Sequence, residues 1–296
     1  MGKYDLTVLD INTNINRFLT YIYGSAVSSK NPQIQFIVGG PGSGKSGVEA
    51  YLKHAFRQIG ESIVSVNSDK IAEFHPKYEE ILETESPEDC YNITRQFVRP
   101  AAPKIFGELR KNRLNILNEN TFDKGEKDIE FVESFKNSDY EIVINIMATD
   151  MFLSRLSCFE REKIMLEIGD SPRGIAKKSY DRMYNNFVAT IQHLESLNLY
   201  DKLNVFIRGA NINKPELVYS LGSDKYPNFV EAINSERAKQ RKHILDNPAE
   251  YLSRLDNTRI FIQQNGINPS RTQESIQGLN ELETEFISEL NNERAR

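Results

Sequence analysis

Residues 39–46 carry the clearest chemistry in the chain, and they read Gly-Gly-Pro-Gly-Ser-Gly-Lys-Ser. This is the pattern GxxxxGK[ST] of a phosphate-binding loop (P-loop), and it lies between an expected strand and an expected helix. Glycines in such a loop let backbone N–H groups turn toward a bound anion, and the helix N-terminus adds its partial positive charge. We expect nucleotide contacts from Gly40, Pro41, Gly42, Ser43, Gly44, Lys45 and Ser46.

Two side chains of this loop have distinct expected roles. Lys45 would contact the β- and γ-phosphates, and the Ser46 hydroxyl would bind Mg²⁺. The sequence therefore predicts a protein that binds ATP or GTP with Mg²⁺. A switch GTPase would also carry an NKxD motif, and a motor ATPase an apolar run that ends in Asp-Glu. Neither pattern occurs in the 296 residues.

Polar residues follow the next two expected strands. Asp69 comes after the second strand, where a kinase keeps the base that takes the acceptor's proton, and Glu119 and Thr121 come at the end of the third. Carboxyl ends of parallel strands meet at one edge of a sheet, so we expect these three side chains to converge on the γ-phosphate. The competing interpretation of Asp69 is a helix cap, because Ser68-Asp69 is good capping chemistry.

The hydrophobic pattern indicates which elements position these residues. Apolar runs predict strands at 34–38, 62–66, 115–118, 141–147 and 204–207. Helical spacing predicts helices at 10–23, 46–58, 128–135, 152–168 and 176–197, and a mostly helical stretch at 78–113 interrupted near Pro100 and Pro103. This alternation predicts an α/β fold, a P-loop kinase-like parallel sheet with helices on both faces.

We expect three regions along the chain: an N-terminal helix and linker at 1–32, a P-loop kinase core at 33–228, and a helical C-terminal extension at 229–296. The last helix is expected to start at Ser270, with Gln273 completing a capping box. Its apolar stripe, which we expect to pack on the same chain, consists of Leu279, Leu282, Phe286 and Leu290.

Composition excludes several classes of protein. The net charge of −5, from 37 basic and 42 acidic residues, argues against a protein that coats nucleic acid. No apolar run is long enough to span a membrane, and two cysteines and four histidines predict neither disulfides nor a zinc site. We expect a cytoplasmic protein that binds no nucleic acid and no membrane.

The passage around Asp69, VNSDKIAEFHPKYEEI, resembles the zeta toxin family of P-loop kinases, whose second strand runs into D-x-D-x-[FY]-[KR]-x-x-H-P. Asp69, His75 and Pro76 match that pattern. The resemblance spans roughly residues 12–222. Three further segments resemble the family. Leu117-Asn118-Glu119-Asn120-Thr121 lies where the family has [IL]-I-E-G-T, and Glu160-Arg161 lies in the segment over the active site. Arg173, with Lys177 and Asp181, resembles the later arginine motif of the family.

The resemblance implies a toxin of a toxin–antitoxin pair. Such a toxin uses ATP and Mg²⁺ to phosphorylate the sugar 3′-hydroxyl of UDP-N-acetylglucosamine, and a small helical antitoxin blocks its nucleotide site. Asp69 would accept the hydroxyl proton, and Glu119 and Thr121 would line the sugar and metal side. Arg161 and Arg173 would clamp the transferring phosphoryl group.

The acceptor side departs from the family pattern. The first Asp of D-x-D is Asn67 here, and the arginine of E-G-T-x-R is Asp123, beside Lys124. The helix glutamate that touches the sugar in the family falls near Pro103 or Lys104. Lys104 and Lys124 are therefore candidates for the missing cation, and Lys124 is a candidate substrate contact.

Two other functions stay open at this point. One is a P-loop kinase of a different nucleotide or dinucleotide hydroxyl. The other is a nucleotide-binding partner protein with little turnover. Among the remaining polar and aromatic residues we expect structural roles for His75 and for Tyr180, Tyr184 and Phe187, and a solvated helix face for Lys177, Lys178 and Arg182.

Overall fold

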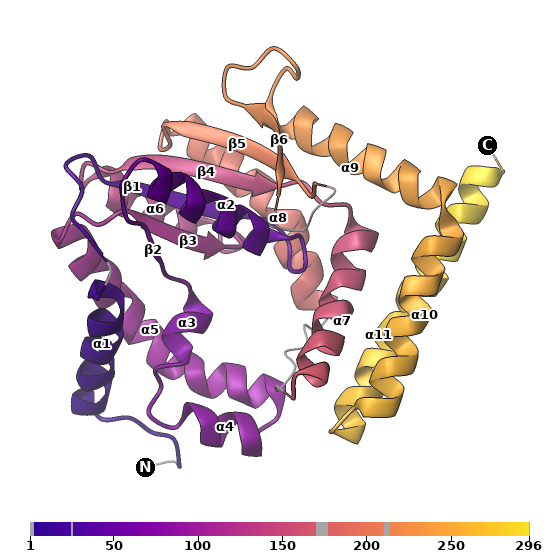
Figure 1. The fold of residues 1–296 in the computed structure, drawn as a ribbon, viewed down its shortest axis with the longest axis horizontal. Helices are drawn as coiled ribbons and strands as arrows, with labels where there is room; N and C mark the ends of the chain where they lie inside the picture. Colours follow the sequence, from indigo (N-terminus) through magenta and orange to yellow (C-terminus); the bar gives the residue numbers. More distant parts are fainter. Residues whose placement is uncertain (1–2, 25, 170–176, 210–213, 296) are drawn as a thin grey trace.

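A computed structural model of the chain describes residues 3–24, 26–169, 177–209 and 214–295 (Figure 1). Its centre is a six-stranded sheet in the order β2-β3-β1-β4-β5-β6. The strands are β1 (Gln33–Val38), β2 (Val64–Ser65), β3 (Ile116–Asn120), β4 (Glu141–Met147), β5 (Lys202–Ile207) and β6 (Glu216–Ser220). The pairs among β1 to β5 are parallel, and β6 is antiparallel to β5. The predicted α/β class is therefore confirmed.

The sheet order sets the position of the P-loop. Strand β1 lies between β3 and β4, and β3 lies next to β2, so the segment after β1 emerges at the middle of the sheet. The segments that follow β2 and β3 leave the same carboxyl edge. This arrangement brings residues about 25 and 75 positions beyond the P-loop to its side, as expected for a ligand crevice in a parallel sheet.

Eleven helices lie in the described residues, and six of them, named below, pack on the two faces of the sheet. On one face α2 packs through Val48 and Leu52. Residues of α1, α5, α6, α8 and α9 form the larger cluster on the other face. The bounds are α1 Val8–Tyr23, α2 Lys45–Gln58, α3 Ser68–Ala72, α4 Tyr78–Thr84, α5 Pro87–Lys111, α6 Glu126–Lys136, α7 Met151–Glu167, α8 Lys177–Ser196, α9 Phe229–Asp246, α10 Pro248–Asn265 and α11 Pro269–Arg294.

A row of polar side chains crosses the sheet from β1 to β6. Asn145, which is fully buried in β4, donates to the Gln35 side chain of β1 at 2.9 Å. Asn204 of β5 donates to the Asn145 amide oxygen at 3.0 Å, and Ser220 of β6 donates to Asn204 at 2.9 Å. Each of these bonds requires one alignment of the strands, so the row fixes their register.

The C-terminal helices form a separate apolar cluster with α7. Figure 1 shows α10 and α11 running side by side next to α7. The expected stripe of the last helix does pack on the same chain, because Leu279, Leu282 and Phe286 are fully buried and Leu290 lies against the same cluster. No helix in the described part of the chain is both long and apolar enough to span a membrane.

Two expected helix boundaries are wrong. The helical stretch at 78–113 breaks at Glu85 and Ser86, where Ser86 caps the next helix, and α5 continues through Pro100 and Pro103. The last helix begins one residue before Ser270, and its cap is Asn268, whose side chain accepts from the Ser270 and Arg271 N–H groups. The capping box of Ser270 with Gln273 is therefore not formed.

Candidate active site

The P-loop is a turn that only glycine can make. Gly44 caps α2 in the left-handed region with a φ of 100°, and Gly42 has a φ of 70°. A Cβ atom on Gly42 would lie 2.2 Å from the Ser154 carbonyl oxygen. No side chain in the described residues caps the N-terminus of α2. The first N–H groups of this helix are thus available to an anion.

Lys45 is folded back onto its own loop. Its Nζ donates to the carbonyl oxygens of Gly39 at 3.1 Å and Gly40 at 3.0 Å. Burial lowers the pKa of Lys45, the charge of Glu119 raises it, and the charge of Arg161 lowers it. The ammonium of Lys45 therefore lies within electrostatic range of both side chains.

Arg208 holds the loop from the opposite side. It follows β5 directly, its Nε donates to the Ser43 carbonyl at 3.1 Å, and its Nη2 donates to the Gly42 carbonyl. Its Nη1 donates to Ser157 Oγ of α7 at 2.9 Å. Arg208 is not predicted from the sequence, because an arginine after a strand belongs to no motif. Its position after a strand two places from β1 was the only available signal.

The segment between β4 and α7 completes this support. Thr149 Oγ1 donates to the Ser43 carbonyl at 2.7 Å, and Ser154 Oγ donates to the Pro41 carbonyl at 2.6 Å. The carbonyls of residues 39–43 therefore all accept hydrogen bonds from side chains. Because these bonds fix the backbone of the loop, its conformation is preorganised for phosphate.

Helix α9 supports that segment in turn. Gln240 donates to the Ala148 carbonyl at 2.7 Å and accepts from the Asp150 N–H at 3.0 Å. Arg241 Nε donates to the buried Asp150 carboxylate at 2.8 Å. Arg237 lies over the ring of Tyr184, 4.2 Å from its centroid. These α9 residues do not touch the loop, so no sequence motif could have revealed them.

Asp69 is not a helix cap. It lies in the first turn of α3, and Asn67 is the cap, because its side chain accepts from the Lys70 N–H at 2.8 Å. The change from the family's Asp to Asn67 thus retains a capping group. The charge of Asp69 raises the pKa of both Lys45 and Glu119, which places it beside them.

Glu119 lies half-buried in β3, and burial raises the pKa of its carboxyl while Lys45 lowers it. Glu49 of α2 also raises the pKa of Glu119, so a third carboxylate belongs to this edge. No group of three potential ligands forms a closed metal cage in the described residues. Mg²⁺ in kinases is held by few protein ligands plus phosphates, and the exposed Ser46 with nearby carboxylates fits that mode.

Arg161 faces the site. Its neighbours bond to the C-terminal helices: Glu160 accepts two bonds of 2.9 Å from Arg254, and Glu162 accepts from Ser275 at 2.9 Å. Arg161 is exposed, and its charge lowers the pKa of Lys45 and of Glu119. The structure therefore brings Lys45, Asp69, Glu119 and Arg161 together. Arg173 lies outside the described residues.

The acceptor side contains an ion pair that was not expected. Arg182 Nε donates to Asp123 Oδ2 at 2.7 Å, and Thr121 Oγ1 donates to the other oxygen of Asp123. Burial acts to raise the pKa of Asp123, but the bonds from Thr121 and Arg182 outweigh it and lower the pKa. Arg182 is exposed, as expected for a solvated face of α8, but it also forms this ion pair. Lys177 is likewise exposed, and it donates to Glu285 of α11 at 2.7 Å.

The two lysines proposed as replacement cations differ in their surroundings. Lys104 Nζ donates to Asn12 of α1 at 2.9 Å, so this side chain contacts the N-terminal helix. The Lys124 side chain is exposed, and its backbone N–H donates to Asp128 at 2.7 Å. Lys124 stays a predicted substrate contact, and both lysines stay candidates for the missing cation.

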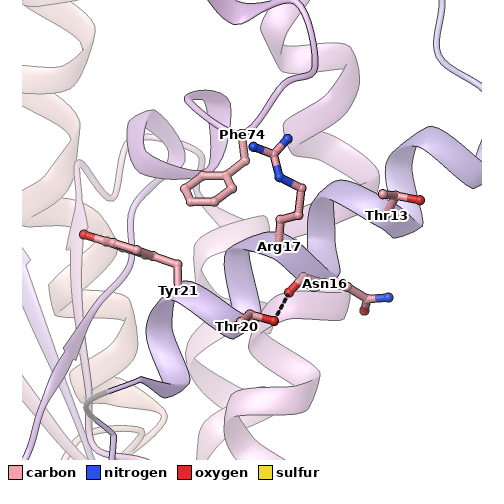
Figure 2. A pocket seen from close by; sticks show the side chains of 6 residues that line it. All are labelled: Thr13, Asn16, Arg17, Thr20, Tyr21 and Phe74. Carbon is pink, nitrogen blue, oxygen red and sulfur yellow. Dashed lines mark hydrogen bonds between the residues drawn. The ribbon is translucent and has the colours of Figure 1, made fainter.

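Helix α1 supports the segment that carries Asp69. Figure 2 shows Arg17, Tyr21 and Phe74 around a surface hollow between α1 and the chain that follows α3. The Phe74 ring lies edge-on to Phe18, with centroids 5.0 Å apart, and 5.8 Å from Tyr21. No P-loop residue lines this hollow. These ring contacts fix the far end of the short α3 segment against the body of the protein.

The residues expected to be structural are buried. His75 accepts from the Lys77 N–H at 3.1 Å and lies edge-on to Phe97, and burial lowers its pKa. Tyr180 stacks on Tyr184, with centroids 5.7 Å apart, and Phe187 is fully buried.

Comparison with known proteins gives two sequence matches. The family model described as Zeta toxin matches residues 20–216. The toxin PezT of Streptococcus pneumoniae serotype 4 is 25% identical over 209 residues, which are 70% of this chain and 81% of that toxin.

Solved structures agree in fold. The structure of the PezAT chromosomal toxin–antitoxin system of Streptococcus pneumoniae matches with a TM-score of 0.64 and 19% identity, over 96% of this chain and 99% of that chain. The AvrRxo1-ORF1:ORF2 complex matches with a TM-score of 0.58 and 11% identity, over 95% and 92%. Its form with ATP matches with a TM-score of 0.52 and 12% identity, over 92% and 82%. Because the family model spans well over half of the chain, in agreement with the P-loop and its surrounding charges, the chain belongs to the zeta toxin family of P-loop kinases.

Proposed function

We propose that this protein is the toxin of a toxin–antitoxin pair, and that it transfers the γ-phosphate of ATP to the sugar 3′-hydroxyl of UDP-N-acetylglucosamine. One observation carries the proposal: Asp69 and Arg161 both lie within electrostatic range of Lys45 of the P-loop and of Glu119, which are themselves within range of each other. A protein that only binds nucleotide needs no carboxylate base at this position. The group therefore favours a kinase over a binding module.

Each residue would have one role in the transfer. Asp69 takes the proton of the acceptor hydroxyl, whose oxygen forms a bond to the γ-phosphorus. The bond from that phosphorus to the bridging oxygen breaks, and ADP leaves with the electron pair. Lys45 and Arg161 stabilise the charge on the phosphoryl oxygens, and the loop N–H groups hold the β-phosphate. When bound through Ser46, Mg²⁺ would neutralise charge on the β- and γ-phosphate oxygens.

A second acceptor class is favoured by Asp123. The family pattern has an arginine at this position, and the family's helix glutamate is matched here by Pro103 or Lys104. These changes alter the positions that contact the acceptor in the family, and they leave the P-loop pattern that binds the nucleotide phosphates unchanged. The runner-up function is therefore a kinase of a different nucleotide or dinucleotide hydroxyl, with the same chemistry at Asp69.

An acceptor panel tests both functions. The purified chain is incubated with Mg–ATP and either UDP-N-acetylglucosamine, UDP-glucose or NAD, and mass spectrometry detects a product heavier by one phosphate. The Asp69→Asn protein is the matched control. Its turnover should be 10²–10⁴-fold lower, the usual contribution of a positioned general base. Product from NAD alone would move the assignment to the runner-up, and equal turnover by the variant would remove Asp69 as the base.

The antitoxin partner is also a proposal. Support comes from the fold match to a toxin–antitoxin system. We propose that a small helical antitoxin covers the nucleotide site of this chain. A short reading frame for an acidic helical protein directly upstream would support it. The encoded protein should then abolish ATP binding in calorimetry, and unchanged ATP affinity in the complex would contradict this placement.

A further inference from the structure

The acceptor-side end of β3 holds a carboxylate that faces the protein and a guanidinium that faces solvent. The Asp123 side chain is only 2% exposed, whereas the Arg182 side chain is 53% exposed. Both Asp123 oxygens are occupied, one by Thr121 and one by Arg182 Nε. A ligand that approaches this edge therefore meets the arginine before it meets the carboxylate.

The bond to Asp123 leaves most of the Arg182 fork available. A guanidinium has five N–H donors, and Asp123 takes the one on Nε. Within the described residues, the Arg182 side chain forms no other hydrogen bond. The Nη groups, which the bond to Asp123 does not use, have the planar geometry that binds phosphate with two parallel bonds.

The position of the pair connects it to the phosphoryl-transfer residues. Thr121 lies two residues after Glu119 on the same chain segment, and Glu119 lies within electrostatic range of Lys45 and Asp69. Of the other cations considered for this side, Lys104 is bonded to Asn12 of α1. Arg182 is consequently the arginine that the described structure places at the end of β3.

We propose that Arg182 binds a phosphate or diphosphate group of the acceptor, and that Asp123 is the positioning residue that orients its guanidinium. The acceptor class is then an anionic, phosphate-bearing alcohol such as a nucleotide-linked sugar or a dinucleotide. This inference rests on the proposed function in one respect, since it takes the end of β3 as the acceptor side. The carboxylate at 123 does not repel such an acceptor, because its charge is neutralised by Arg182.

A binding experiment tests Arg182 without requiring that the true acceptor be known. The P-loop is saturated with Mg²⁺ and a non-hydrolysable ATP analogue, and pyrophosphate is titrated by calorimetry as the acceptor-side probe. Arg182→Gln should raise the pyrophosphate Kd about tenfold or more, because charge-assisted bonds to phosphate are lost. Arg182→Lys should give an intermediate Kd, because it keeps the charge and loses the fork.

Two further variants separate binding from structure. Asp123→Asn should also raise the pyrophosphate Kd, because the arginine loses its anchor, with the affinity for the ATP analogue unchanged. Lys178→Ala removes another exposed charge from α8 and should change neither affinity. An unchanged pyrophosphate Kd in a folded Arg182→Gln protein would overturn the proposal, as would the absence of a second pyrophosphate site in the unmodified protein. Failure to phosphorylate any acceptor would contradict the proposed function alone.

Discussion

At the P-loop, the ammonium group of Lys45, which would contact a nucleotide, is hydrogen-bonded to the backbone of the loop itself. Lys45 Nζ is bonded to two carbonyls, and burial keeps its pKa below the value of a free lysine. A bound phosphate would take over those contacts and favour the charged form. ATP binding thus replaces the bonds from Lys45 to carbonyls by bonds to phosphate. The net gain in binding free energy comes from the attraction between the ammonium and the phosphate charge.

Replacement of Lys45 tests this account. Lys45→Ala should abolish measurable ATP binding or raise its Kd at least a hundredfold, because a buried charge-assisted contact to phosphate is removed. The variant should melt like the parent protein, since Lys45 contributes no apolar surface to the three core clusters. Calorimetric titration with Mg–ATP measures the affinity. An unchanged Kd would show that the loop does not bind the nucleotide.

His75 makes stability depend on pH. Burial lowers its pKa below 6.5, so the folded protein keeps the ring neutral while the unfolded chain takes up a proton. The contribution of His75 to stability is therefore complete above pH 6.5 and is lost as the pH falls from 6.5 toward the lowered pKa, by at most about 1.4 kcal/mol per pH unit.

The measurement is urea unfolding at pH 7.5 and pH 5.5. His75→Gln should reduce the difference in unfolding free energy between the two pH values. His54→Gln, at an exposed position, should retain the full difference. If the His75 variant kept the same pH dependence as the parent, other groups would have to be responsible.

At the scale of elements, uninterrupted apolar runs predict strand bounds accurately, whereas proline wrongly predicts an interruption of a helix. Strand β4 was predicted with its observed bounds, because Glu141–Met147 is a continuous β-rich run. Helix α5 continues through Pro100 and Pro103, although proline removes a helical donor, because flanking residues such as Phe97, Ala101 and Ile105 are fully buried. Strand β6 was missed, because only Val218 and Tyr219 of its five residues are buried.

The polar row across the sheet makes a stability prediction. Asn145→Leu should destabilise the protein by about 2–4 kcal/mol, because Gln35 and Asn204 each lose a buried partner and an unpaired buried group costs about 1–3 kcal/mol. Chemical denaturation measures the change. Asn185→Leu on the exposed face of α8 is the control and should change stability little. A neutral Asn145→Leu would mean that the row does not hold the strands together.

At the scale of the whole molecule, helix α9 is connected to the P-loop through the Ala148–Asp150 segment, to which both are hydrogen-bonded. Gln240→Ala should raise the ATP Kd about three- to tenfold without any direct contact to the nucleotide, because the Ala148–Asp150 segment that holds Ser43 loses two bonds. Lys242→Ala on the same helix, whose side chain is 75% exposed, should leave the Kd unchanged. Equal affinities for both variants would show that the segment is held by other contacts.

Some residues of the candidate site can be predicted from the sequence, and others are identified only by their tertiary contacts. Lys45 is predicted by the P-loop motif, Asp69 and Glu119 by their positions after strands, and Arg161 by the family resemblance. Their side chains do lie together, although their roles stay predictions. Arg208 bonds to carbonyls of the P-loop, and Gln240 and Arg241 of α9 bond to the Ala148–Asp150 segment, each from a distant part of the chain. Their identity depends on the tertiary arrangement, which no local pattern encodes. The pairing of Asp123 with Arg182, 59 residues apart, was hidden for the same reason.

The contacts of α9 with the Ala148–Asp150 segment imply thermodynamic reciprocity. If docking of this helix favours the loop conformation that binds ATP, ATP must favour docking of the helix by the same free energy. Saturating nucleotide should therefore slow amide hydrogen exchange in α9, far from the phosphates, and a ligand that displaces α9 should release nucleotide. The C-terminal helices then act as a control point through which another molecule could set the activity of the P-loop from outside the catalytic edge.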